Sequence, residues 1–180
     1  MYGMVNRAIE ELIIDGYGSA TWESVKMVAG VDEDVFISST GYPDEITYAL
    51  VTAGAAELGI SLPEFLRWFG IHWVTRTARV HYADLLAAGG SSVREFLVNL
   101  PHFHQRISLL FPNLDPPEFR CEEVAERSLR LHYYSRRPGL THFVDGLILG
   151  LGTYFQTSVT VSITAKKSSG ADHDEFLVEW

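Results

Sequence analysis

The chain has 180 residues, of which 47% are hydrophobic and 21% are charged, a composition typical of a globular domain. The formal net charge of −9 argues against a nucleic-acid or anionic-membrane partner, since both need a basic surface. The single cysteine, Cys121, excludes an intramolecular disulfide and suits a reducing compartment. Acidic residues interrupt the apolar N-terminal segment, which therefore has the pattern of neither a signal peptide nor a membrane span. We expect a cytoplasmic domain.

Helical periodicity dominates the first half of the chain. Apolar spacing predicts helices over residues 4–13, 21–29 and 43–59, each closed by a glycine. The segment "SLPE" at 61–64 has the Ser-x-x-Glu spacing of a capping box and is expected to open a fourth helix. That helix carries Trp73 on its apolar side.

A longer helical stretch is predicted over residues 93–111. Pro101 lies inside it, so we expect a kink or a restart there, because proline cannot donate the helical hydrogen bond. His104 follows on the same apolar face as Leu100 and Ile107. Two interpretations stay open at this point: a core histidine with backbone partners, or a single axial ligand to a haem iron in a hydrophobic cavity.

The 7 histidines raise the question of a metal site. His102 and His104 would lie about 200° apart on a helix, so they cannot serve one metal ion together. The sequence has no HExxH, CxxC or His/carboxylate triad spacing, and no P-loop or GxSxG motif. Hydrolase and nucleotide-binding functions are therefore weakly supported.

After "PNLDPP" the pattern changes to strand alternation. Residues 119–123 and 128–135 are predicted as strands joined by a polar turn, and alternation returns at 159–163 and 176–180. Residues 140–151 form an apolar helical stripe between them. We predict an α+β fold: a helical N-terminal half, then an antiparallel sheet of about four strands with one long helix.

The segment "LRLHYYSRRPGL", residues 129–140, contains a row of hydrogen-bond donors. If it is extended, the apolar face continues into Tyr133, Ser135 and Arg137, about 6–7 Å apart. The opposite face is the solvated one and carries Arg130, His132, Tyr134 and Arg136. The row is either a solvent-facing strand end or part of a haem site. Haem would explain both features, since it needs an apolar pocket, one axial nitrogen and donors for two propionates.

Tyr133-x-Ser135-x-Arg137 resembles the YxSxR motif of the haem nitric-oxide/oxygen-binding (H-NOX) family, in which this motif binds the haem propionates. The family comprises bacterial stand-alone gas sensors related to the haem domain of soluble guanylate cyclase. The resemblance extends over "MYGMVNRAIEELI", "FGIHWV", "FHQRISLLFPNLDPP" and "SGADHDEF". It implies the H-NOX fold and a haem b (iron protoporphyrin IX) cofactor.

Position by position, the resemblance implies His104 as the proximal iron ligand and Pro117 as the proline that presses on and distorts the haem. It implies Gly70 as a glycine at a distal-side hinge. Four positions match residues that line the distal pocket: Val5, Trp73, Phe143 and Leu147. Family members that bind O₂ use a tyrosine where this chain has Phe143. We interpret Trp73 as steric lining; its indole and His142 are the side chains that could donate to O₂ if they point inward.

We therefore expect one haem-binding sensor domain over residues 1–180, with a helical subdomain at about 1–60 and a haem-proximal α/β subdomain at about 61–180. It would bind NO, and also CO, without catalytic activity of its own. The resemblance implies signalling to a separate effector such as a histidine kinase or a cyclic-dinucleotide enzyme. NO binding is expected to release His104, relax the haem against Pro117 and shift the two halves of the fold.

Three alternatives stay open. The first is an O₂ sensor. The second, ranked lower, is a haem enzyme such as a peroxidase, which would draft His72 or His142 as its distal acid–base group. The third is a haem-free module that kept the fold and binds an apolar ligand or a partner protein.

Overall fold

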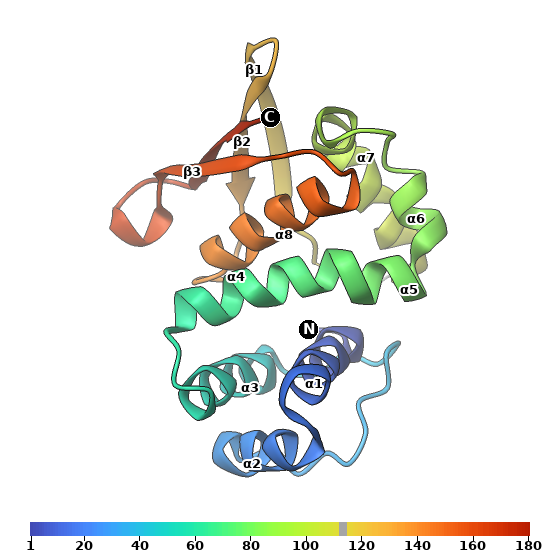
Figure 1. Ribbon diagram of the computed structural model, residues 1–180, viewed down its shortest axis with the longest axis vertical. Coiled ribbons are helices and arrows are strands. Elements are labelled where there is room, and N and C mark those ends of the chain that lie inside the picture. The colour runs from blue at the N-terminus through green and yellow to red at the C-terminus, as the bar shows by residue number, and fades with distance from the viewer. Residues whose placement is uncertain (112–114) are drawn as a thin grey trace. The chain divides into compact units, whose positions relative to one another are not determined.

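The computed structural model describes residues 1–111 and 115–180, so the "PNL" of the segment "FHQRISLLFPNLDPP" lies outside the described residues (Figure 1). The chain forms two compact units, Met1–Phe69 and Gly70–Trp180. Their boundary falls inside a helix. The expected start of a haem-proximal subdomain near residue 61 stays a prediction.

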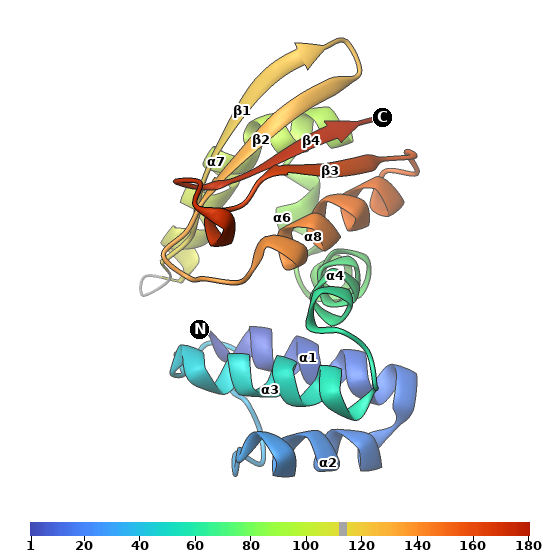
Figure 2. The same cartoon turned by 90° about the vertical axis from the view of Figure 1, so that its left-hand side faces the viewer.

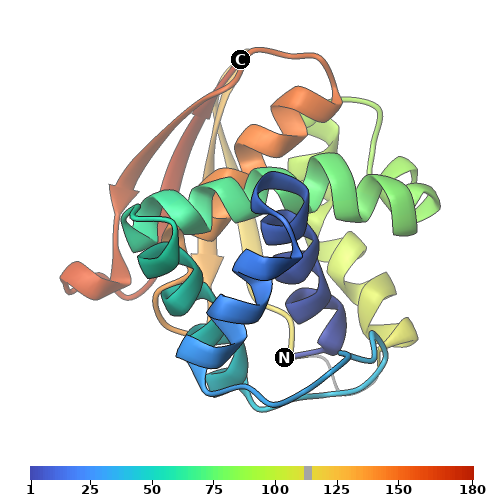
Figure 3. The ribbon, with the colours of Figure 1, turned by 60° about the horizontal axis from the view of Figure 1, so that its bottom comes forward.

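The first unit is a small helical assembly in which α1 (Gly3–Tyr17), α2 (Ser19–Ala29) and α3 (Asp44–Glu57) pack on one another (Figure 3). Gly30 ends α2 in a left-handed conformation with φ of 66°, which a residue with a side chain rarely adopts. The three predicted helices are confirmed. Their buried apolar residues include Ile9, Leu12, Ile13, Trp22, Val25 and Leu50.

A capping box opens the fourth helix, α4 (Leu62–His72), as predicted. The Glu64 N–H donates to Ser61 Oγ at 3.3 Å, and Glu64 Oε2 accepts from the Ser61 N–H at 3.0 Å. The helix then passes into a π-helical turn, η1 (Trp73–Ala78), which the sequence pattern does not indicate. Such turns shift the register of the following residues and often occur at functional sites.

The second unit contains the sheet. Its strands lie in the order β1-β2-β4-β3 and all neighbours are antiparallel, an order that can be followed in Figure 2. The elements after η1 are α5 (Arg79–His81), α6 (Ala83–Ala87), α7 (Val93–Leu110), β1 (Glu118–Ala125), β2 (Ser128–Tyr134), α8 (Thr141–Tyr154), β3 (Thr160–Ala165), η2 (Lys167–Ser169) and β4 (Asp174–Glu179). The predicted α+β class, with four antiparallel strands and a long helix beside them, is confirmed.

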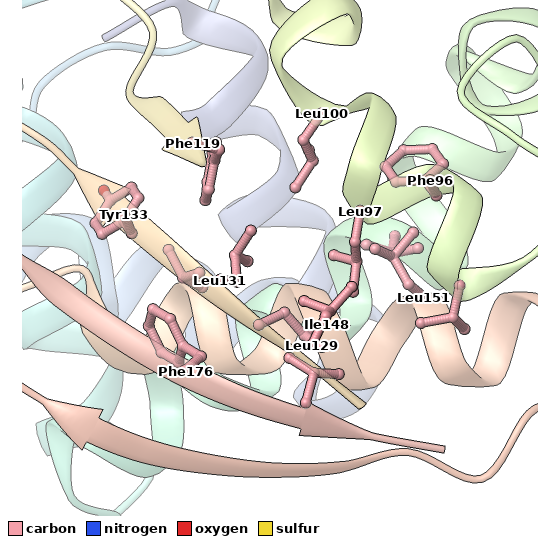
Figure 4. Close-up of a cluster of buried hydrophobic side chains, with 14 of the residues drawn as sticks. Phe96, Leu97, Leu100, Phe119, Leu129, Leu131, Tyr133, Ile148, Leu151 and Phe176 are labelled. Carbon is pink, nitrogen blue, oxygen red and sulfur yellow. The ribbon is translucent and has the colours of Figure 1, made fainter. Parts of the chain in front are cut away.

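One face of the sheet forms the core of this unit. Leu129, Leu131 and Tyr133 alternate along β2 and are all buried, as predicted. Opposite Leu131 on β4 lies Phe176, which is fully buried. Figure 4 shows these side chains meeting others from α7, β1 and α8. Burying each large apolar side chain contributes about 1.5–3 kcal/mol, so this contact holds both helices against the sheet.

A buried carboxylate joins three segments at one end of the sheet. The Thr141 hydroxyl, at the start of α8, donates to Asp174 Oδ2 at 2.6 Å. The Lys167 N–H, at the start of η2, donates to Asp174 Oδ1 at 2.7 Å. The Lys167 ammonium in turn donates to the Ser135 carbonyl at 3.0 Å. Asp174 therefore fixes the end of the β3–β4 hairpin against the loop that follows β2.

Among the described residues, no single helix is long and apolar enough to cross a membrane, although the bent pair Asp44–Glu57 and Leu62–His81 meets those criteria when taken together.

We predict that Thr141→Val destabilises the protein by about 1–3 kcal/mol, because it leaves a buried carboxylate oxygen of Asp174 without its donor. Urea denaturation measures the change. Thr153→Val is the matched control, since Thr153 is exposed on the same helix and its hydroxyl donates to the Leu149 carbonyl one turn back. Equal effects of the two substitutions would contradict the role given to Asp174.

Candidate functional site

His104 lies on α7 with its ring half-buried. Nδ1 is 3.0 Å from the Leu100 carbonyl oxygen, which can only accept, so Nδ1 carries the proton and Nε2 keeps its lone pair. Burial lowers the pKa of His104, and the bond to Leu100 opposes that shift only in part. The ring is therefore neutral at pH 7 and has the protonation state that a metal ligand requires.

Aromatic contacts connect His104 with the first residue of the donor row. The His104 ring stacks on Phe119 of β1, with centroids 5.3 Å apart and planes 28° apart. Phe119 in turn lies against Tyr133 of β2 at 5.2 Å, and Figure 4 shows these two rings side by side. Phe103 meets the His104 ring edge-on at 5.8 Å. The imidazole thus lies between the rings of Phe103 and Phe119.

The three residues of the donor row do not all lie on one strand. Tyr133 belongs to β2, whereas Ser135 and Arg137 lie in the loop that follows it. Ser135 Oγ accepts from the Arg137 N–H at 3.0 Å, and Arg137 Nη1 donates to the Asp115 carbonyl at 2.7 Å. The guanidinium therefore ties this loop to the segment that contains Pro117, which is half-buried just before β1.

Of the kink or restart expected at Pro101, the restart is wrong, because one uninterrupted helix runs through it, and the kink stays a prediction. Pro101 has no N–H for the Leu97 carbonyl one turn back. The Cys121 thiol, on the helix-facing side of β1, supplies a donor instead, with Sγ 3.1 Å from the Leu97 oxygen. Burial raises the pKa of Cys121 to about 11, so the thiol keeps the proton that it donates.

The predicted distal residues of the second unit gather where α4, η1 and α8 meet. A Cβ on Gly70 would lie 2.3 Å from the Phe143 carbonyl oxygen and 2.6 Å from the Leu147 nitrogen, so only glycine allows this approach of the two backbones. Trp73 and Leu147 are half-buried and pack against the hydrophobic core. Phe143 is half-buried on α8.

Three further residues singled out in the sequence lie on α1, α4 and α8. Val5 is half-buried on α1, in the Met1–Phe69 unit, and its contact with a haem stays a prediction. His142 is half-buried on α8, and His72 is buried near the end of α4.

The sequence pattern did not indicate one further cluster. His132, His173 and Glu175 place nitrogen and oxygen atoms within 4.8 Å of one another on the other face of the sheet. Spacing along the chain cannot find it, because β2 and β4 bring it together. These two strands are separated in the chain by α8 and β3, and only their antiparallel pairing places His132 opposite Glu175.

The residues of the second unit fit an iron porphyrin. A neutral imidazole with an available Nε2 stands among aromatic rings, and a hydroxyl and a guanidinium share one loop nearby. These are the groups that hold a haem iron and its carboxylates.

We predict that Cys121→Ala destabilises the protein more with Pro101 present than in a Pro101→Ala background, with a coupling of about 0.5–1 kcal/mol. Alanine at position 101 restores a backbone donor to the Leu97 carbonyl, so the thiol is then dispensable. Urea denaturation of the four proteins closes the cycle. An equal loss in both backgrounds would show that Cys121 acts only by packing.

A protein-family model described as haem-NO-binding matches residues 2–163. Among curated proteins, soluble guanylate cyclase gcy-31 of Caenorhabditis elegans is 30% identical over 91% of this chain, and the rat guanylate cyclase soluble subunit beta-2 is 33% identical over 63%. The chain spans 23% and 17% of the lengths of these two relatives.

Solved structures show the same fold. An H-NOX protein from S. oneidensis in the Fe(II)NO ligation state superposes with a TM-score of 0.90 at 18% identity, covering 99% of this chain and 98% of that one. The Fe(II) unliganded H-NOX protein from K. algicida gives 0.84 at 23% identity, covering 99% and 96%. With the family match over nearly the whole chain, these similarities confirm the resemblance noted in the sequence: the chain belongs to the haem-NO-binding (H-NOX) family.

Proposed function

We propose that this chain is a haem-based nitric oxide sensor with His104 as the only protein ligand to the iron. The observation that carries the proposal is the state of the His104 ring. Its Nδ1 is committed to the Leu100 carbonyl, and its neutral Nε2 has no hydrogen-bond partner among the residues that the structure describes. A backbone partner on one ring nitrogen is how proteins orient a histidine whose other nitrogen binds a metal.

The donor row is proposed to hold the haem propionates. Tyr133 and Ser135 offer hydroxyls, and Arg137 offers a planar guanidinium that can grip a carboxylate through two N–H groups. Arg137 Nη1 donates to the Asp115 carbonyl oxygen, which is a neutral acceptor. A charged propionate carboxylate would compete with that oxygen for the guanidinium. A charge-assisted bond contributes about 1.5–3 kcal/mol against about 1 for a neutral one, so Arg137 contributes most to haem retention.

The distal side favours NO over O₂. A bound haem would supply a ferrous iron to which NO, CO or O₂ can coordinate, with His104 as its protein ligand. Phe143 offers no hydrogen-bond donor, and with Leu147 it would form an apolar distal side; Val5 is proposed as a further distal residue. We assign Trp73 a steric role there, since its half-buried ring packs against the core.

The signal is proposed to leave through α7. Loss of the His104 bond to the iron would free α7 to move, and Pro117 would press on the bound haem. NO can favour the resulting conformation only by the difference between its affinities for the two conformations. The output goes to a separate effector, for which we propose a histidine kinase or a cyclic-dinucleotide enzyme.

We predict that His104→Gly removes the protein bond to the iron while leaving a cavity that added imidazole fills. Imidazole should then restore the wild-type ferrous Soret spectrum. His102→Gly is the matched control, because His102 is exposed two residues earlier on the same helix. Loss of ligation in His102→Gly but not in His104→Gly would refute the assignment.

We also predict that the ferrous protein binds NO and CO but shows no oxy spectrum in air. Phe143→Tyr, which adds a hydroxyl, should produce measurable O₂ binding, whereas Phe143→Leu should not. Absorption spectra of the three proteins under each gas test this. An oxy spectrum of the wild-type protein would favour the O₂-sensor alternative, and peroxidase activity with added H₂O₂ would favour the enzyme.

A further inference from the structure

The outer face of the sheet, opposite to the one covered by α7 and α8, carries a compact group of nitrogen and oxygen atoms. His132 of β2 lies directly opposite Glu175 of β4, and His173 precedes Glu175 by two residues, so all three side chains share this face. His132 Nδ1 is 2.8 Å from His173 Nε2 and 3.6 Å from Glu175 Oε2. The ligand atoms of the three side chains all lie within 4.8 Å of one another.

The His173 ring is oriented by its neighbours. Its Nδ1 donates to the Asp172 carboxylate, which leaves the lone pair of Nε2 directed at His132. The Tyr134 ring stacks on the imidazole with centroids 4.2 Å apart and planes 22° apart. A carboxylate behind a histidine fixes the tautomer and raises the basicity of the other nitrogen, as in carboxylate–histidine–zinc arrangements.

The other two side chains are oriented in the same way. Glu175 Oε1 accepts from the Thr164 hydroxyl at 2.5 Å and lies 3.1 Å from Arg130 Nε, while Oε2 faces His132. On the far side of the His132 ring, Nε2 lies 3.8 Å from Glu122 Oε2. Each inner atom is thus backed by an outer polar partner.

From this geometry we propose that His132, His173 and Glu175 form a binding site for a divalent transition-metal ion of the Zn²⁺ class. Tetrahedral zinc with ligands at about 2.0–2.2 Å separates neighbouring donor atoms by about 3.3 Å. The observed separations of 2.8 and 3.6 Å lie on either side of that value. Two nitrogens and one oxygen fill three positions, and water takes the fourth.

The proton balance of binding is simple. Since His173 Nε2 is an acceptor, the proton between the rings sits on His132 Nδ1. When the metal binds, that proton moves to Nε2 of the same ring, which faces Glu122 Oε2 at 3.8 Å. Among the three proposed ligands, only Glu175 carries a negative charge.

Charge and burial also favour a cation. The carboxylates of Glu122, Asp172 and Glu175 surround the cluster, and the guanidiniums of Arg130 and Arg120 lie on the same face. The side chains of His132, His173 and Glu175 are 19%, 15% and 22% exposed. A metal ion can therefore enter from solvent, and its charge is less screened than at an open surface.

The test is zinc binding by the untagged, haem-loaded protein after treatment with a chelator. Calorimetric titration with ZnCl₂ and elemental analysis should give about one zinc per chain. His132→Ala or His173→Ala should weaken binding at least about 100-fold, and Asp172→Asn about tenfold, the range found for ligands and their outer partners. His81→Ala is the matched control, since His81 is exposed outside the cluster, and it should leave binding unchanged.

Two further variants distinguish loss of zinc binding from a folding effect and from an effect on the haem site. Glu175→Gln preserves the shape of the side chain, so a loss of zinc affinity with an unchanged far-UV spectrum supports the site without a folding effect. His104→Gly should leave the zinc stoichiometry unchanged, which separates this site from the proposed haem site. Wild-type affinity no better than that of His132→Ala, or an equal loss in His81→Ala, would overturn the proposal.

Discussion

The packing of α7 and α8 on one face of the sheet is the contact on which the second unit depends. It places His104 on one helix, Phe143 on the other and Tyr133 on the strand between. The interior that holds them is almost wholly apolar, with Leu131 and Phe176 fully buried at its centre. Burial of apolar side chains stabilises this unit, so the polar side chains at the edge of the apolar core can serve ligand binding.

The side chains of β2 differ in chemistry between the buried and the outer face of the sheet. Tyr133 points into the core, while His132 and Tyr134 beside it point outward. A slip of one residue would exchange these faces, so the register must be fixed. The pairing of β2 with β4 and the carboxylate of Asp174 fix it at the end where the donor row begins.

Most of the fold was predictable because it follows local periodicity. The helices of the first unit, the capping box of Ser61 and Glu64, and the alternation of β2 all rest on neighbours a few residues away. What could not be predicted rests on distant partners. Pro101 does not break α7, because a thiol 24 residues from Leu97 replaces the missing donor. The cluster around His132 likewise exists only once β2 and β4 pair.

The substitute donor at Leu97 also determines how α7 responds to force. A helix resists bending through its backbone hydrogen bonds. In α7 the Leu97 carbonyl accepts instead from the Cys121 thiol of β1. The backbone ladder of α7 is therefore weakened between Leu97 and Pro101, one turn before His104. A displacement of His104 would bend α7 at this point. Because the Cys121 thiol bonds to the Leu97 carbonyl, that bend would also act on β1.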